Sequence, residues 1–168
     1  MVLALDHIHI YAADPDVSIA FYETYFDAEC VGSLPTLDER RNHFLILGAQ
    51  IIVISAFPSG VSARESPGVH DGASKAGFGV SHIGLNVARL DAHVGRLKTA
   101  NVRVHGEPVT SGPIRYVYVD APDGVVLELT QYVLPRRFTP ALALLNAMNR
   151  SVHASKKTIA RTLFRLVG

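Results

Sequence analysis

Short runs in which apolar and polar residues alternate recur along the chain, and each run predicts a half-buried β-strand. The first run covers residues 5–10. A segment with apolar residues at helical spacing follows, and Asp14 or Asp16 can cap the start of this helix. Three more strand-like segments come next, at residues 28–32, 43–47 and 50–57. The pattern of the first third of the chain is therefore βαβββ.

The same order of elements repeats with an offset of 75 residues. Residues 80–85 match residues 5–10, which places His82 opposite His7. A helical pattern then leads to Ala100, and strand-like segments follow at 102–105, 114–119 and 125–132. Duplicated modules that each bury one sheet face can pair around a cleft. We therefore predict an α+β fold in which two βαβββ modules form a curved, barrel-like mixed sheet.

These patterns divide the chain into four parts. The first module is predicted at 1–57, a linker or lid at 58–79, the second module at 80–133 and a basic helical extension at 134–168. The linker is rich in Gly, Ser, Pro and Ala. In the extension, Thr139 and Pro140 suit a helix start, and Ser151 or Ser155 can begin a second helix.

Composition narrows the class of protein. Apolar residues make up 48% of the chain and charged residues 18%, which suits a packed core. The chain has neither an apolar run of membrane-spanning length nor the start expected of a signal peptide, so we expect no transmembrane segment. Its one cysteine, Cys30, has no adjacent base, and it is interpreted as a structural thiol in a reducing, cytoplasmic setting.

Charge is unevenly placed along the chain. The first 135 residues carry nine basic and fifteen acidic side chains, a formal −6, whereas the remainder carries +7. A basic amphipathic helix can lie on an anionic membrane, bind nucleic acid or dock on an acidic partner. We favour packing on the acidic core of the same chain or on a second subunit. Because no aromatic residues interleave with the basic ones, we expect no nucleic-acid partner.

Three residues far apart in the sequence can hold a divalent metal. Strand alternation puts His7 on one face of the first strand and His82 on the matching face of the repeat, while Glu128 interrupts a run of apolar residues. A buried carboxylate is costly unless it is paired or bound to a metal. Two histidines and one carboxylate form a known ligand set. In the alternative interpretation, both histidines are core residues and Glu128 pairs with Arg115.

The motifs around these residues resemble those of the vicinal-oxygen-chelate superfamily, the glyoxalase, bleomycin-resistance and extradiol-dioxygenase group. The resemblance covers residues 3–133 and is carried by His7 with Asp14, by Phe21-Tyr22, and by the segments 81–87 and 120–129. It implies metal ligands at the first and last strands of each module. His7, His82 and Glu128 occupy three of those four positions, and Val53 occupies the fourth.

The two-histidine, one-glutamate set resembles that of extradiol dioxygenases, as does Tyr118. It implies one divalent metal, with iron(II) favoured, and a small catechol-like or vicinal-oxygen substrate. A lyase or isomerase of the glyoxalase or epimerase kind, using zinc, nickel, cobalt or manganese, is the first alternative. A metal-free, antibiotic-binding protein is the second. Family habit and the apolar start of the extension also imply a homodimer.

The candidate catalytic residues are His9 and Tyr118. His9 shares a strand face with His7, and with Val53 unable to act as a base, His9, His43 and Tyr118 are the candidate bases. His9 is equally a candidate to orient a ligand or the substrate. The candidate substrate-binding residues are His43, Ser55, Asn86, Arg115 and Tyr116.

Overall fold

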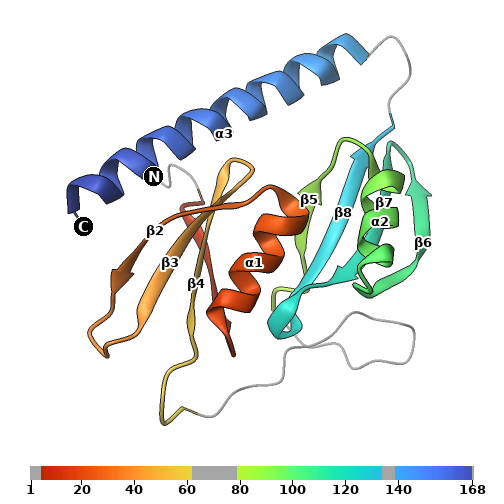
Figure 1. Ribbon diagram of the computed structural model, residues 1–168. Helices are drawn as coiled ribbons and strands as arrows, with labels where there is room; N and C mark the ends of the chain where they lie inside the picture. The colour runs from red at the N-terminus through yellow and green to blue at the C-terminus, as the bar shows by residue number, and fades with distance from the viewer. Residues whose placement is uncertain (1–4, 62–78, 134–138, 168) are drawn as a thin grey trace. The chain divides into compact units, whose positions relative to one another are not determined.

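Two four-stranded mixed sheets contain the strands of the part of the chain that the structure describes. The structure is a computed structural model that describes residues 5–61, 79–133 and 139–167. Its elements follow the order βαβββ twice and end in a long helix (Figure 1). This confirms the predicted α+β class and the duplication. The strands of each described module form an open, curved sheet of their own.

The first sheet has the strand order β1-β4-β3-β2. Its strands are β1 (His7–Ala12), β2 (Glu29–Pro35), β3 (Arg41–Leu47) and β4 (Gln50–Ala56). β1 runs parallel to β4, and the other neighbours are antiparallel. Helix α1 (Pro15–Phe26) contributes Tyr22 and Phe26 to the core, together with Ile10, Ile52 and Ile54 of the sheet.

The start of α1 follows from its sequence. Asp14 is the cap, because its Oδ1 accepts hydrogen bonds from the backbone N–H groups of Asp16 at 3.0 Å and Val17 at 3.4 Å. Pro15, which lacks an N–H group, occupies the first turn, where that group would have no helical partner. The helix ends at Phe26, and the cap residue Asp27 that follows has a left-handed φ of 54°.

The second sheet repeats this topology with the order β5-β8-β7-β6. Its strands are β5 (Ile83–Asn86), β6 (Val104–Ser111), β7 (Ile114–Asp120) and β8 (Val126–Tyr132). Helix α2 (Leu90–Thr99) buries Leu90, Val94 and Leu97, and a 3-10 turn, η1 (Pro122–Gly124), joins β7 to β8. β5 is parallel to β8, as β1 is to β4.

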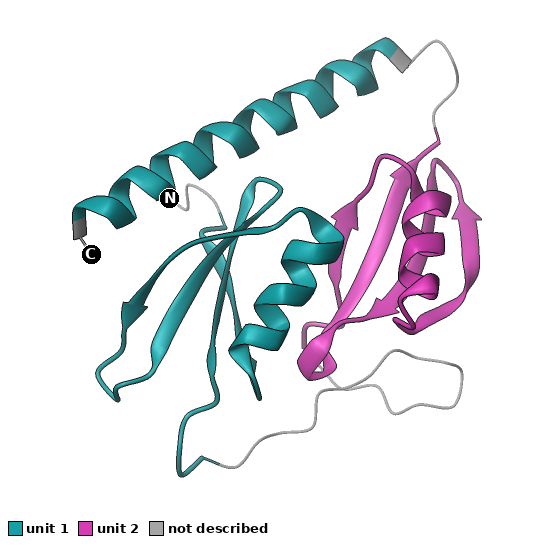
Figure 2. Cartoon of the chain, in the orientation of Figure 1, with its two compact units in different colours: residues 1–63, 140–168 teal, residues 64–139 magenta. Residues whose placement is uncertain are grey.

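The chain divides into two compact units (Figure 2). Unit 1 contains residues 1–63 and 140–168, and unit 2 contains residues 64–139. The basic extension therefore belongs to the unit of the first module. Most of the predicted linker, at 62–78, and the start of the predicted extension, at 134–138, lie outside the described residues.

The extension forms one helix, α3 (Thr139–Val167), where the sequence predicted two. Its interior after Pro140 contains neither glycine nor proline, so nothing in the sequence interrupts the helical hydrogen bonds. Later hydroxyl groups donate to the preceding turn: Thr158 Oγ1 to the carbonyl of Ala154 at 3.1 Å, and Thr162 Oγ1 to that of Thr158 at 3.0 Å. Such bonds let hydroxyl residues remain inside a helix.

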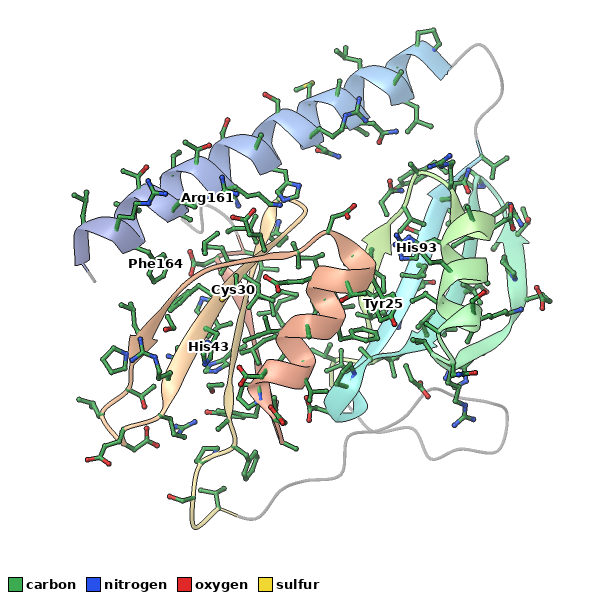
Figure 3. All side chains as sticks on the ribbon, viewed as in Figure 1. Tyr25, Cys30, His43, His93, Arg161 and Phe164 are labelled. Carbon is green, nitrogen blue, oxygen red and sulfur yellow. The ribbon has the colours of Figure 1, made fainter. Side chains whose placement is uncertain are left out.

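Within unit 1, α3 docks on the sheet through one aromatic ring and a group of cations. Phe164 lies against Gly32, and its ring centroid is 5.0 Å from that of Phe44. Arg161 and Lys157 form ion pairs with Glu29, the latter at 3.3 Å (Figure 3 labels Arg161 and Phe164). Lys156 donates to the carbonyl of Ala49. Packing of the basic extension on its own module is therefore confirmed.

None of the helices in the described residues combines the length and apolar character needed to cross a membrane.

Candidate metal centre

One face of the second sheet gathers polar and aromatic side chains. In the strand register, Gly84 lies beside Glu128, and Glu128 lies beside Tyr118. The next row contains Asn86, Thr130 and Tyr116. Paired residues in neighbouring strands point to the same side of a sheet. The opposite side carries Leu127, Leu129, Val117 and Val119, which are all buried.

His82 and Glu128 lie together on this polar face. The His82 Nε2 atom is 3.2 Å from Glu128 Oε2, and both side chains are largely shielded, with 32% and 21% of their surfaces exposed. The Tyr118 ring centroid is 5.3 Å from that of His82 and 5.8 Å from that of Tyr116. Two of the three predicted metal ligands are therefore neighbours, with a tyrosine beside them.

The environment of Tyr118 keeps its hydroxyl protonated. Burial raises the pKa of Tyr118 above its usual value, and the negative charge of Glu128 adds to the effect. The neighbouring Tyr116 and a hydrogen bond to Glu128 act in the same direction. Tyr118 is therefore a hydrogen-bond donor at neutral pH.

Arg115 does not share this face. It lies one residue before Tyr116 on β7, and its guanidinium forms two hydrogen bonds of 2.8 Å with the carboxylate of Asp91 on α2. The structure therefore places it away from the other candidate substrate-binding residues of unit 2. The same contact removes the alternative in which Arg115 pairs with Glu128.

In unit 1, His7 and His9 lie on the exposed face of β1. Their ring centroids are 6.4 Å apart. His9 Nε2 forms a 2.9 Å hydrogen bond with Ser55 Oγ, and Ser55 is fully buried. Ser55 thus contacts His9 and is removed from solvent. Burial lowers the pKa of His9, and the charges of His7 and Arg40 lower it further.

Val53 and His43 lie on opposite faces of the first sheet. Val53 pairs with His9 in the register and is buried, so the fourth ligand position of the superfamily contributes only an apolar side chain. His43 pairs with Ile54, which pairs with Ile10, and these two residues belong to the core packed by α1. His43 (labelled in Figure 3) is therefore on the face opposite His9.

Each candidate histidine ligand is held by the residue that precedes it. His7 Nδ1 contacts Asp6 Oδ2 at 2.7 Å, and His82 Nδ1 contacts Ser81 Oγ at 3.2 Å. Both contacts leave Nε2 as the nitrogen available to a metal, and metal-binding histidines commonly have such partners. Sequence analysis missed Asp6 and Ser81, although their matching places in the repeat were a usable signal.

An aromatic surface continues from His9 along the same face of unit 1. The Tyr11 ring centroid lies 4.9 Å from that of His9 and 5.5 Å from that of Phe57, and Tyr11 is 46% exposed. The Arg40 guanidinium lies 5.8 Å from the centroid of Tyr11. Sequence analysis did not identify the contribution of Phe57, which follows the end of β4.

A second histidine–carboxylate pair lies in unit 2. His105 Nε2 is 2.6 Å from Asp120 Oδ1, and His105 pairs with Tyr118 in the register of β6 and β7. This pair also escaped sequence analysis, because a histidine at a strand end has no distinctive local pattern.

The candidate ligands are divided between the units. His7 belongs to unit 1, whereas His82 and Glu128 belong to unit 2. Among all the residues that the structure describes, no group of three or more histidine, cysteine, aspartate or glutamate side chains is placed to hold a metal ion.

Comparison with known proteins gives the family. The sequence profile of the Glyoxalase/Bleomycin resistance protein/Dioxygenase superfamily matches residues 4–129. The chain belongs to this superfamily. Among curated protein sequences, none matches the chain significantly.

Solved structures share the fold. A glyoxalase family protein from Bacillus cereus has a TM-score of 0.65 and 18% identity, over 80% of this chain and 97% of that one. A mutant fosfomycin resistance protein from Listeria monocytogenes, solved with manganese(II) and a dihydroxypropylphosphonic acid, has a TM-score of 0.58 and 20% identity, over 82% and 97%. The trypanothione-dependent glyoxalase I of Leishmania major has a TM-score of 0.59 and 19% identity, over 89% and 99%.

Proposed function

We propose that this protein is a metal-dependent enzyme whose divalent metal, iron(II), is held by His7, His82 and Glu128, and that it is an extradiol-type dioxygenase. Its substrate would be a small catechol-like or vicinal-oxygen compound. The observation that carries the proposal is the 3.2 Å separation of His82 Nε2 and Glu128 Oε2 on the polar face of unit 2.

That separation suits two ligands of one metal ion. Nitrogen and carboxylate ligands bind at about 2.1 Å, so adjacent ligands on a tetrahedral or octahedral ion lie about 3.0–3.4 Å apart. The donor set also fits, since imidazole and carboxylate are ligands of iron(II) and similar ions. Such a metal, when bound, lowers the pKa of a substrate hydroxyl and, if it is iron(II), supports electron transfer to dioxygen.

The protein's own residues would orient the substrate and move protons. His9, held by Ser55, presents an imidazole that can accept a hydrogen bond or a proton from a substrate hydroxyl. The Tyr118 hydroxyl, which bonds to Glu128 here, would have to turn to donate a hydrogen bond to a substrate oxygen. The face beside Glu128 is open at Gly84. The nearest atom to a Cβ added at this glycine would be Glu128 Oε2, at 3.9 Å.

The exposed aromatic surface supports a ring-containing substrate. Tyr11 and Phe57 present planar side chains on the face that carries His7 and His9. A flat ring gains contact area and favourable edge-to-face geometry against such side chains. Asn86 and Tyr116 share the face of Glu128 and are the remaining candidates for substrate binding.

A lyase or isomerase is the second candidate, and one observation favours it. Two relatives by fold are a glyoxalase I and a fosfomycin resistance protein solved with manganese(II) and a vicinal diol. Zinc, nickel, cobalt or manganese would then replace iron. Val53 weighs against this candidate, because it removes a carboxylate that could act as a base. A metal-free binding protein is the third candidate.

Metal analysis and oxygen uptake distinguish these candidates. Anaerobically purified protein should contain about one iron per chain, and adding a catechol should consume oxygen. Metal without oxygen consumption would support the lyase or isomerase, and protein that binds no metal would overturn all metal-dependent readings. His82→Ala should lose the metal, whereas His93→Gln, a matched change on α2, should retain it.

We also propose a cytoplasmic location and a homodimeric state. The single, half-buried Cys30 suits a reducing compartment. The apolar residues of α3 support a dimer. Sedimentation of the full chain and fractionation of the cells that produce it would test these two points.

A further inference from the structure

Helix α3 has two apolar faces, and only one of them packs on unit 1. The inner face carries Ala160 and Phe164, which are partly buried, and the cations that bind unit 1. A second, outer stripe is exposed to solvent along the whole helix. Its members are Leu144, Leu145, Met148, Val152, Ile159, Leu163 and Leu166, which are 46–77% exposed.

The spacing of the outer stripe is that of a helix–helix seam. Leu145, Met148, Val152, Ile159 and Leu166 fall on alternating steps of three and four residues once the small side chains of Ser155 and Thr162 are included. Apolar residues at this spacing pack against another helix. The stripe therefore predicts a helical partner rather than a sheet or a flat surface.

Charge on α3 favours a partner of the same kind. The helix has no acidic residue, but three of its cations already contact unit 1: Lys156 at the carbonyl of Ala49, and Lys157 and Arg161 at Glu29. The positive charge is thus directed to the inner face, and the residues along the outer stripe are mostly uncharged. An acidic protein or an anionic membrane would gain little there, whereas an identical stripe could approach without strong repulsion.

The size of the stripe is sufficient for a dimer. A helix of 29 residues is about 43 Å long. If each of the seven exposed side chains loses most of its apolar surface, two copies together bury on the order of 1,000 Å², the size at which stable interfaces begin.

We propose that the outer stripe of α3 pairs with the same stripe of a second copy of this chain, which makes α3 the dimer interface. The proposal rests on the homodimer proposed above and is independent of the reaction. Because the stripe extends from Leu145 to Leu166, Ser155 lies close to its middle. In a symmetric pair the two Ser155 residues therefore face each other, whether the helices run parallel or antiparallel.

Light scattering of the full-length, metal-loaded protein tests the interface. The native chain should have twice the mass of its 18.2 kDa monomer. Ile159→Glu should weaken the dimer at least about tenfold, because it places a charge in the seam. Ala154→Glu, which adds the same charge on an exposed side of α3 away from the stripe, should remain dimeric. Circular dichroism checks that both variants stay folded.

Cross-linking gives a second measurement that does not depend on a disruptive change. Oxidised Ser155→Cys should form a disulfide-linked dimer, and Ala154→Cys should not. A native monomer would overturn both the dimer and this interface. A dimer that Ile159→Glu leaves intact, and that Ser155→Cys does not cross-link, would overturn the interface alone. A monomer that co-sediments with phosphatidylserine vesicles would assign the stripe to a lipid surface instead. Bound metal, measured in the same samples, reports separately on the proposed function.

Discussion

At the scale of single residues, the alternation of strand residues predicted much of the candidate site. The register places Asn86 on the face of Glu128, and the 3.2 Å contact of His82 with Glu128 agrees with this placement. The same alternation argues against one pair of the predicted substrate-binding residues. Arg115 and Tyr116 are consecutive on a strand, so they cannot both face the same substrate, and Arg115 is the one bound to Asp91.

His43 and Ser55 needed information that the sequence does not contain. The face of His43 depends on how β3 pairs with β4, and this register is set by packing of the two strands and their turn. Ser55 contacts His9 but is fully buried, and this burial depends on the neighbouring side chains. Alternation therefore predicts which residues of one strand share a face, but it does not align separate strands.

Replacing Arg115 tests its assignment to the helix side of unit 2. Arg115→Gln should leave metal content and the Michaelis constant for substrate unchanged and should lower the thermal midpoint only slightly, because the Asp91 carboxylate of the ion pair is largely exposed. Tyr116→Phe, on the other face, is the matched comparison for steady-state kinetics. A large rise in the Michaelis constant for Arg115→Gln would contradict this assignment.

The thiol of Cys30 should react slowly. Burial raises the pKa of Cys30, and the charges of Glu23 and Glu29 act in the same direction, while a hydrogen bond with the backbone of Gly32 opposes them. Because only the thiolate is nucleophilic, alkylation at pH 7.5 should be at least about tenfold slower than in urea-unfolded protein. Mass spectrometry after timed iodoacetamide treatment measures the two rates, and equal rates would refute the expectation.

At the scale of elements, helical spacing predicted α1 and α2, with a capping residue for α1 alone. The strand pattern predicted all the strands that the structure describes, although β6 extends to Ser111, well beyond the predicted end at residue 105. The prediction for the extension was wrong in one respect, since Ser151 or Ser155 was expected to begin a second helix and α3 continues through both. A serine has this meaning only where the preceding residues leave the helix, and the apolar stripe runs through both positions. The contact between Phe164 and Gly32 was not predictable, because the docking of α3 joins residues that are far apart in sequence.

Because Phe164 packs against Gly32, the cost in stability of a methyl group at position 32 should depend on whether Phe164 is present. A side chain at Gly32 would overlap the ring of Phe164, and part of the overlap is with its Cβ, so the whole side chain must move. Gly32→Ala should therefore destabilise unit 1 by about 1–3 kcal/mol. In a Phe164→Ala background, the same change should cost much less. Urea unfolding of the four proteins measures the coupling, and purely additive costs would show that the contact is absent.

Acid should release α3 from unit 1 in two stages. The hydrogen bond from Arg161 is the main reason that the pKa of Glu29 lies below its ordinary 4.5, and burial is the main reason that the pKa of His153 lies below its ordinary 6.5. For both groups the folded pKa is the lower one. Their stabilising contribution is therefore complete above the ordinary value and is lost as pH falls towards the folded value.

Hydrogen exchange of α3, corrected for the intrinsic effect of pH, measures this release. Protection should fall first below about pH 6.5, where unfolded His153 begins to gain a proton, and again below about pH 4.5 for Glu29. The charges that face these groups are Lys157 and Arg161, with Asp27 near His153. Glu29→Gln should abolish the second stage only, and protection that rises on acidification would contradict the assignment.

At the scale of the whole molecule, the internal repeat was the most informative pattern in the sequence. A shared offset aligned two histidines, two helices and two late strands, so it predicted the repeated topology. Composition and charge added less. They predicted a basic extension on an acidic core, but the observed contact concentrates on Glu29, one of many acidic residues.

A metal bound by both modules should stabilise them together. A ligand that binds only the folded state, present at a hundred times its dissociation constant, adds about 2.7 kcal/mol. Removing the metal with a chelator should therefore lower the melting temperature of both units, and iron(II) should restore it. In Glu128→Gln the chelator should have little effect. Stabilisation confined to unit 2, measured by hydrogen exchange, would exclude His7 as a ligand.

The contacts of the two Nδ1 atoms show that the duplicated modules have diverged. The Nδ1 atom of His7 contacts the carboxylate of Asp6, and the Nδ1 atom of His82 contacts the neutral hydroxyl of Ser81. A carboxylate partner makes an imidazole a stronger electron donor than a hydroxyl does. If both histidines bind the proposed metal, they would therefore bind it with unequal strength, and a substrate that displaces weakly held groups would meet a different electronic environment beside each histidine.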